Sequence, residues 1–209
     1  LENIDEKNII ITGNTVIDAL ISSLEKIEKN TSQFVDEFSE KVNNKEIILV
    51  TGHRRENHGK GFNEICAALK RIALDNPEIV IVYPVHLNPK VQEPVLRLLA
   101  AVSNIILIKP LSYPDFIWLM NRSKIILTDS GGIQEEAPSL GKPVLVLRDT
   151  TERPEAIIAG TVILVGTDQD LICKTTNSLL KDSVLYEKMS GLHNPYGDGN
   201  ASRKIVDFL

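Results

Sequence analysis

The segment Thr128–Pro143 contains residues whose types and spacing suit the binding of a nucleotide. Its Asp129–Gly132 portion lies where an apolar run ends and a helical pattern begins. Free backbone N–H groups and the positive end of a helix dipole favour an anion at such a position. Ser130 is a suitable N-cap, and the adjacent glycines allow a ligand to approach the backbone closely. Because helical side chains lean toward the N-terminus, the Glu136 carboxylate can reach a sugar diol held beside that anion.

A second candidate, the segment Thr51–Gly61, combines two His, two Arg, one Lys and three Gly in one strand-to-helix loop. Arg54 and Arg55 can meet a phosphate with a planar fork, and His53 can donate a hydrogen bond to a pyrophosphate. The alternative is a solvated charged turn. The loop lacks the spacing of a P-loop, which leaves phosphoryl transfer from ATP unsupported. Ligands in open α/β sheets bind outside the carboxyl ends of the strands, so we expect this loop and the Ser130 loop to face one crevice.

Two further loops bring candidate residues to the same edge of the sheet. His86 follows a predicted strand, where it is either a ligand contact or a hydrogen-bonded loop residue. Arg148 and Arg153 follow another strand closely enough to compete for one ligand, although a surface charge cluster around a Pro that starts a helix is the structural alternative. Phe116 can form the wall of a base pocket. No His or Cys spacing typical of a metal site is present in the sequence.

The elements between these loops alternate along the chain. Most strand candidates are continuous Val, Ile and Leu runs, which suits parallel strands covered on both faces. The alternation predicts an α/β fold with one open, doubly wound (Rossmann-like) parallel sheet and helices on both faces. The predicted strands are Ile9–Thr12, Glu46–Thr51, Ile79–Pro84, Ile105–Ile108, Lys124–Thr128, Val144–Leu147 and Val162–Val165. The predicted helices are Thr15–Ile27, Thr31–Val42, Gly61–Ala73, Lys90–Ala101, Tyr113–Asn121, Gly132–Leu140, Asp168–Leu180, Ser183–Ser190 and Asn200–Phe208.

Composition argues against several classes of protein. The net charge of −5 and the lack of a basic run are unlike a nucleic-acid binder. Cys66 and Cys173 have no CxxC spacing and are expected to be small buried apolar residues. No stretch of the sequence reaches the roughly 18 apolar residues of a membrane span. The polar, acidic first residues are unlike a signal peptide. We therefore expect a cytoplasmic protein that binds neither nucleic acid nor membrane.

Four stretches together resemble the non-hydrolysing UDP-N-acetylglucosamine 2-epimerase family. They are TGHRREN (Thr51–Asn57), TDSGGIQEEAPSLGKPVLVLRDTTERPEA (Thr128–Ala156), AGT (Ala159–Thr161) and NPYGDG (Asn194–Gly199). The long central stretch is highly specific, and the resemblance covers nearly the whole chain from TGNTVIDAL (Thr12–Leu20) onward. Family members have a two-domain, glycosyltransferase-like architecture with the sugar nucleotide between the domains. The resemblance implies that this chain is the C-terminal half.

The resemblance also implies which residues bind UDP. Ser130, Gly131 and Gly132 would hold the diphosphate, and Glu136 would accept from the ribose hydroxyls. The backbone of Phe116 would read the uracil edge.

Four cationic or imidazole side chains have implied roles around the phosphates. Arg153 and His53 would contact the diphosphate, and His53 would also lie near the leaving group as the catalytic residue. Arg54 and His86 match positions implicated in binding a second, activating UDP-N-acetylglucosamine in bacterial members of the family.

The reaction implied by the resemblance needs no metal or redox cofactor. UDP is eliminated to give 2-acetamidoglucal and then added back to give UDP-N-acetylmannosamine, within the biosynthesis of cell-surface polysaccharide. In the family, the acidic residues that remove the C2 proton lie in an N-terminal domain that we expect to be absent from this chain. A positioned base matters for the rate because a sugar C2 proton is weakly acidic. We therefore expect this chain alone to bind UDP or its sugar nucleotide weakly and not to epimerise.

The expected organisation assigns residues 1–20 to an interdomain connection with the start of the first helix. Residues 21–209 form a UDP-binding Rossmann-like domain that ends in a helix over residues 200–208. The full-length protein is expected to be a homodimer. Two alternatives stay open: the donor domain of a nucleotide-sugar glycosyltransferase, and a non-catalytic module that binds a UDP-sugar.

Overall fold

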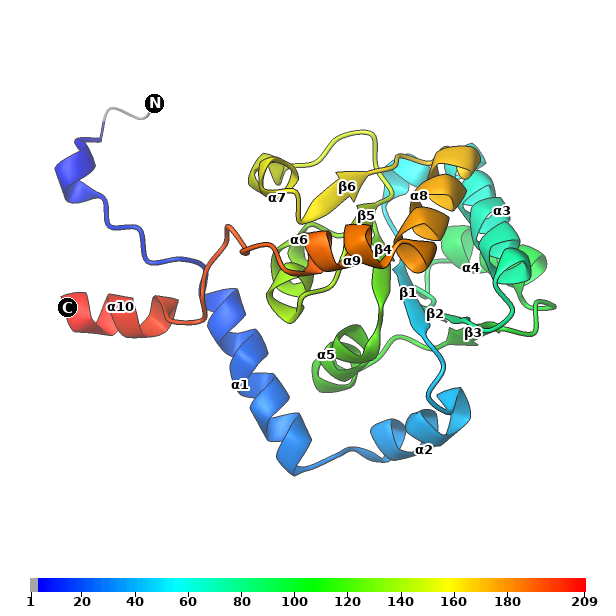
Figure 1. Cartoon of the computed structure of the whole chain (residues 1–209), viewed down its shortest axis with the longest axis horizontal. Helices are drawn as coiled ribbons and strands as arrows, with labels where there is room; N and C mark the ends of the chain where they lie inside the picture. Colours follow the sequence, from blue (N-terminus) through cyan, green and yellow to red (C-terminus); the bar gives the residue numbers. More distant parts are fainter. Residues whose placement is uncertain (1–3) are drawn as a thin grey trace.

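Six parallel strands form the centre of the molecule (Figure 1). The structure, a computed structural model, describes residues 4–209. The strands follow the order β3-β2-β1-β4-β5-β6, and most of their residues are buried, as expected for a parallel sheet covered on both faces. Their bounds are β1 (Ile47–Thr51), β2 (Val80–Pro84), β3 (Ile105–Ile108), β4 (Ile125–Thr128), β5 (Val144–Val146) and β6 (Val162–Leu164). The predicted fold class is confirmed.

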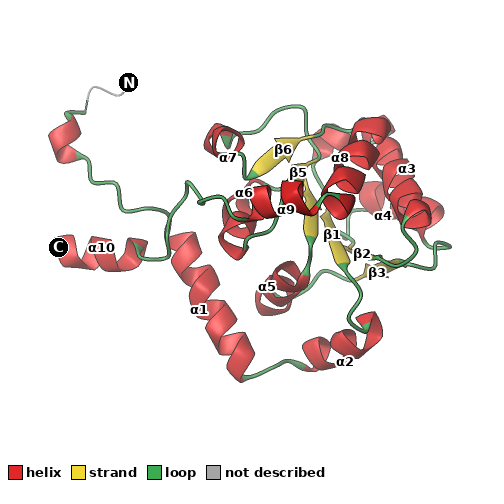
Figure 2. Ribbon diagram, viewed as in Figure 1, coloured by secondary structure: helices red, strands yellow, loops and turns green. Residues whose placement is uncertain are grey.

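Helices cover both faces of the sheet (Figure 2). Alternate residues of β1 enter two different core clusters: Ile48 and Val50 pack with α3, α4, α8 and α9, whereas Ile47 and Leu49 pack with α1, α2, α5, α6 and α7. This alternation follows from the two-residue period of a strand. The helices are α1 (Thr15–Lys29), α2 (Gln33–Val42), α3 (Lys60–Asp75), α4 (Pro89–Leu99), α5 (Tyr113–Arg122), α6 (Gly131–Glu136), α7 (Pro154–Ala159), α8 (Gln169–Lys181), α9 (Ser183–Ser190) and α10 (Ala201–Phe208). Three short 3₁₀ helices are η1 (Glu6–Asn8), η2 (Arg55–Asn57) and η3 (Ala137–Leu140).

The order of the strands reverses between β1 and β4. The chain runs outward from β1 through β2 to β3 and then returns to place β4 on the other side of β1. Thr51 and Thr128, the last residues of β1 and β4, are paired, and their Oγ1 atoms are 2.6 Å apart. Ligands of open α/β sheets bind at such a switch point, outside the carboxyl ends of the strands. The loops after β1 and β4 therefore flank the position where a ligand is expected.

Three of the differences from the predicted elements are the largest. Ile9–Thr12 is not a strand, because this largely exposed segment forms no hydrogen-bonded pair with any strand of the sheet. The six-residue helix α7 was not among the predicted helices, because it is too short for a helical period to show. It begins at Pro154, which agrees with the structural alternative of a Pro that starts a helix. The helix predicted over 132–140 changes to a 3₁₀ helix at Ala137, because Pro138 lacks the N–H that an α-helix needs. Cys66 and Cys173 are free and buried, as predicted.

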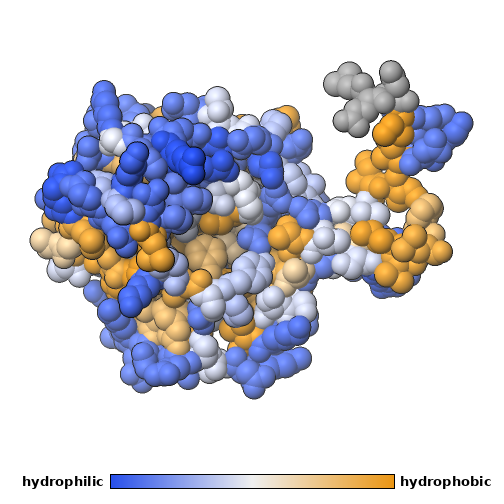
Figure 3. Space-filling model, turned by 180° about the vertical axis from the view of Figure 1, so that it is seen from behind, coloured by the Kyte–Doolittle hydropathy of each residue, from blue (hydrophilic) through white to orange (hydrophobic). Residues whose placement is uncertain are grey.

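The first described residues and α10 lie away from the sheet (Figure 1). The Asp18 carboxylate in α1 accepts hydrogen bonds from the amides of Ala201 and Ser202, at 3.1 and 2.8 Å, which fixes the start of α10 beside α1. Both extensions carry exposed apolar side chains, among them Ile11 and Phe208, and Figure 3 shows apolar residues beside hydrophilic ones along the N-terminal arm. Helix α1 runs without a break through residue 20, where the expected organisation places the boundary between the interdomain connection and the UDP-binding domain. None of the helices described over residues 4–209 is both long and apolar enough to cross a bilayer.

Candidate nucleotide-binding site

The β4–α6 junction presents the start of a helix at the switch point. Ser130 is the N-cap residue of α6, but its hydroxyl makes no capping hydrogen bond. Its amide instead donates to Thr128 Oγ1 at 3.0 Å, which fixes the turn. The amides of Gly131 and Gly132 belong to the first turn, where N–H groups have no intrahelical acceptor. The junction therefore offers amide donors to an anion, with the Ser130 hydroxyl beside them.

Glu136 ends α6, and its carboxylate is bound by a phenol that the sequence did not indicate. Tyr113 Oη, from the first turn of α5, donates to Glu136 Oε1 at 2.6 Å. Burial raises the pKa of the Glu136 carboxyl above its ordinary value, whereas the Tyr113 hydrogen bond lowers it and the charge of Glu135 raises it. Burial, together with the bond to Glu136, also raises the pKa of Tyr113. Glu136 is thus a nearly buried acceptor with one oxygen occupied by a partly exposed tyrosine.

Arg153 lies over the start of α6. A Cβ placed on Gly131 would lie 3.8 Å from the guanidinium carbon of Arg153. Arg153 Nε donates to Oε1 of Glu135. The other carboxylate oxygen of Glu135, Oε2, accepts from Asn14 Nδ2 at 2.5 Å. The hydrogen bond that Arg153 donates to Glu135 raises the pKa of Arg153, which keeps the guanidinium charged. The cation is therefore held beside the amide donors of α6, with its side chain about one third exposed.

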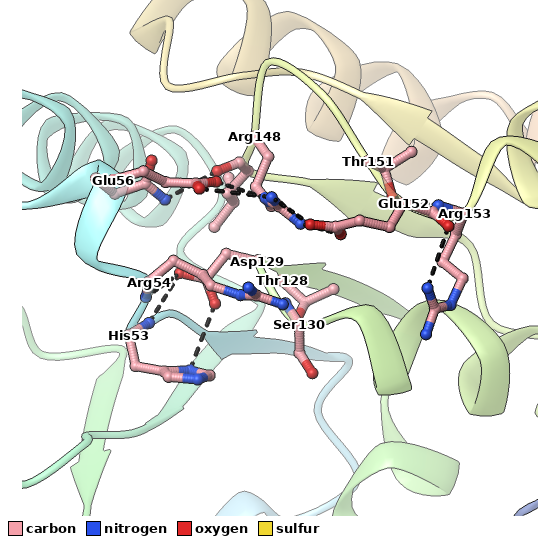
Figure 4. Close-up of polar contacts among 12 residues, drawn as sticks. His53, Arg54, Glu56, Thr128, Asp129, Ser130, Arg148, Thr151, Glu152 and Arg153 are labelled. Carbon is pink, nitrogen blue, oxygen red and sulfur yellow. Dashed lines mark hydrogen bonds and ion pairs between the residues drawn. The ribbon is translucent and has the colours of Figure 1, made fainter.

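The loop after β1 is held by Asp129, the first residue after β4. Asp129 Oδ2 accepts from the amides of His53 and Arg54, both at 2.8 Å, and Asp129 Oδ1 lies 3.5 Å from His53 Nδ1 (Figure 4). The His53 ring stacks on the His86 ring, with centroids 5.3 Å apart and planes 15° from parallel. The structure thus brings His53, Arg54 and His86 together beside the β4–α6 junction.

Arg148 is not available to a ligand, which corrects the expectation that it competes with Arg153. Its buried guanidinium donates to Glu56 Oε1 at 2.5 Å and to both oxygens of Glu152, at 2.6 and 3.0 Å (Figure 4). The hydrogen bond from Arg148 lowers the pKa of Glu152 to about 2. Arg148 therefore joins the loop after β1 to the loop after β5 and has a structural role.

Two hollows lie near these loops. One, of about 450 Å³, is lined by His53, Arg54, Arg55, Glu56, His86 and Asn88. The other, of about 590 Å³, lies beyond β6 and is lined in part by Lys60, Asp149 and residues 164–171. The first contains both residues predicted to bind a second ligand. The second is lined by Arg148, whose guanidinium is engaged by Glu56 and Glu152, and by none of the residues predicted to bind UDP.

Phe116 lies one turn into α5 and is partly buried against the core. Its amide donates to the carbonyl of Ser112 at 2.9 Å, so this N–H is engaged within the helix. The bond from Tyr113 to Glu136 places the first turn of α5 beside the end of α6. That Phe116 and this turn form one wall of a pocket for the base stays a prediction.

The chain is similar to known proteins over its whole length. Residues 1–209 match a family model described as UDP-N-acetylglucosamine 2-epimerase. A UDP-N-acetylglucosamine 2-epimerase from Campylobacter jejuni is 57% identical over 214 residues, covering 100% of this chain and 56% of that protein. The crystal structure of UDP-GlcNAc 2-epimerase from Neisseria meningitidis bound to UDP-GlcNAc superposes with a TM-score of 0.92 at 52% identity, covering 99% of this chain and 56% of that one. An S. aureus protein solved with UDP has a TM-score of 0.89 at 44% identity, covering 98% of this chain and 55% of that one. The chain therefore spans about half the length of the curated relatives it matches.

Proposed function

Because the chain belongs to the UDP-N-acetylglucosamine 2-epimerase family, we propose that it is the UDP-binding part of an enzyme that interconverts UDP-N-acetylglucosamine and UDP-N-acetylmannosamine. One observation carries the proposal: donors for a diphosphate and an acceptor for a ribose converge at the switch point of the sheet. The donors are the amides at the start of α6, the guanidinium of Arg153 and the ring of His53. The acceptor is Glu136.

The proposed pose follows the length of α6. The diphosphate lies on the amides of Gly131 and Gly132 and the hydroxyl of Ser130, because an anion is stabilised at a helix N-terminus. The ribose diol donates to the carboxylate of Glu136, which is nearly buried. Tyr113 occupies only Oε1 of this carboxylate, and the ribose either shares that oxygen with Tyr113 or displaces the phenol. The uracil lies against the first turn of α5, near the backbone of Phe116.

The proposed reaction proceeds by elimination and addition. A base removes the proton from C2 of the sugar while the C1–O bond breaks, and the electron pair of that bond leaves on UDP to give 2-acetamidoglucal. A proton then returns to the opposite face of C2 and UDP adds back at C1. His53 donates to the departing diphosphate, and Arg153 balances its charge, because groups aimed at developing charge stabilise a transition state.

The base for C2 is proposed to lie in a part of the enzyme outside these 209 residues. Glu135 is occupied by Arg153 and Asn14, and Glu136 by Tyr113, so both suit binding better than proton removal at the sugar. The exposed apolar side chains of the N-terminal arm and α10 are proposed to pack against that further part. A homodimer and a cytoplasmic location remain our proposals for the complete enzyme.

Arg54 and His86 are proposed to contact a second sugar nucleotide. Both line the hollow of about 450 Å³ beside His53. A phosphate of this second sugar nucleotide would lie close to the UDP-sugar bound at α6. The His53 ring stacks on the His86 ring, so each bound ligand could affect the binding of the other through His53.

Calorimetry of the 209-residue chain tests the proposed function. We expect weak binding of UDP and of UDP-N-acetylglucosamine, no binding of ATP, and no conversion to the manno sugar. Binding of ATP without binding of UDP would defeat the assignment of the ligand. Normal conversion by this chain alone would instead show that the base lies within it.

Replacement of Tyr113 by Phe should move the pH dependence of UDP binding. The carboxylate is the better acceptor for the ribose, so affinity should be full above the Glu136 pKa and fall as the pH drops through it. Burial already raises that pKa, and Tyr113 opposes the rise. Loss of the phenol should therefore shift the fall in affinity to higher pH. Calorimetry across a pH series measures the shift, and Glu136→Gln, which has no carboxyl to titrate, provides the baseline. Identical profiles for Tyr113→Phe and the native chain would exclude this coupling.

A further inference from the structure

Asp129 is a completely buried carboxylate whose partners all come from the loop after β1. Its side chain has no exposed surface. Oδ2 accepts from the amides of His53 and Arg54, whereas Oδ1 has no hydrogen-bond partner among the described residues. A buried charge is costly unless it is paired. The group placed to pair with Oδ1 is His53 Nδ1, at 3.5 Å (Figure 4).

The surroundings hold the His53 ring in this position. Tyr83 Oη donates to the carbonyl of Gly52 at 3.0 Å, directly before His53. A Cβ on Gly52 would lie 3.1 Å from Tyr83 Oη, so the loop lies tightly against that phenol. On its other side the ring stacks on His86, whose own Nδ1 accepts from the amide of Asn88 at 3.1 Å.

We propose that Asp129 is the positioning residue for His53. Its Oδ1 retains the proton on Nδ1 of the ring and so leaves Nε2 as the atom that meets the ligand. A carboxylate that accepts from the Nδ1–H of a histidine sets the tautomer and stabilises the imidazolium. The imidazolium form can then donate from Nε2 to a phosphate oxygen. Only this last step rests on the proposed function; the tautomer is a property of the chain without ligand.

The competing possibility is that Asp129 only clamps the loop through Oδ2. The substitution Asp129→Asn separates the two roles. Its carbonyl oxygen can still accept from the amides of His53 and Arg54, so the clamp is retained. Its amide group then faces the ring as a donor, which requires a bare Nδ1 and moves the proton to Nε2.

Imidazole ¹⁵N NMR of the 209-residue chain tests the proposal. The His53 signals are assigned by their loss in His53→Gln. We expect the Nδ1–H tautomer or the imidazolium in the native chain, and the Nε2–H tautomer in Asp129→Asn. The exposed His193 is the internal control and should not change. A native His53 that carries its single proton on Nε2 would overturn the proposal without any variant, as would an unchanged tautomer in a folded Asp129→Asn.

UDP calorimetry then separates this proposal from the proposed function. His53→Gln should weaken binding by about tenfold, as for a lost charge-assisted hydrogen bond. Asp129→Asn, which leaves a neutral Nε2–H donor, should weaken binding by less, and the double variant should lose no more than His53→Gln alone. Losses that multiply in the double variant would overturn the positioning role. If the native chain does not bind UDP, the proposed function is contradicted, whereas the NMR result still decides the role of Asp129.

Discussion

Replacement of Arg153 by Ala is expected to weaken UDP binding by about 2–4 kcal/mol, the lower part of the range for truncation of one partner in a buried hydrogen-bonded charge pair, since Arg153 is about one third exposed. The guanidinium lies beside Gly131, where we place the diphosphate. Its removal also leaves Glu135 without its cation, and the side chain of Glu135 is only 10% exposed. The ligand would then meet an unpaired carboxylate where the native chain presents a cation.

A double variant distinguishes these two contributions. If repulsion from Glu135 accounts for part of the loss, Arg153→Ala with Glu135→Gln should bind UDP more tightly than Arg153→Ala alone. Arg203→Ala is the matched control, because Arg203 is exposed on α10 and makes only a 3.6 Å pair with Asp207. Native affinity in Arg153→Ala would remove this residue from the site.

Replacement of Phe62 by Ala is expected to lower the free energy of unfolding by about 3–5 kcal/mol, the usual cost of a buried aromatic truncation. Phe62 is fully buried on α3 in the core cluster that covers one face of the sheet. Its ring also supports the loop after β1, since Phe62 Cε1 lies 3.7 Å from a Cβ placed on Gly52. The cavity would therefore lie directly beneath the loop that carries His53.

Urea unfolding measures this loss as a lower midpoint with an unchanged slope. Leu74→Ala, on the same helix but 65% exposed, is the control and should change stability by no more than about 0.5 kcal/mol. Equal losses in the two variants would show that burial on α3 does not determine stability.

The strands of the sheet could be predicted because each is a run of mostly apolar residues, which in the central strands are buried on both faces. Ile9–Thr12 has the same composition, and it fails as a strand because a strand also requires a neighbour, which its own residues do not encode. The meeting of the His53 loop with the Ser130 loop could also be predicted, since carboxyl ends of parallel strands lie at one edge. The reversal of strand order at β1 and β4 then makes that edge the switch point.

The pairing of charges at the site could not be predicted. Arg148 and Arg153 occupy the same loop and look equivalent in the sequence, yet Arg148 is buried between Glu56 and Glu152, whereas Arg153 lies over α6. Neither the role of Tyr113 nor that of Asp129 was predicted. Each depends on side chains that are distant in the chain, although the place of Asp129 directly after a buried strand was a signal that could have indicated it.

The central claim is that UDP binds at the switch point between β1 and β4. The most direct test is a titration of the ¹⁵N-labelled 209-residue chain with UDP, followed by amide chemical shifts. We expect the largest changes at residues 53–54 and 130–132, with smaller ones in the first turn of α5. The largest changes at residues 164–171, around the hollow beyond β6, would contradict the claim.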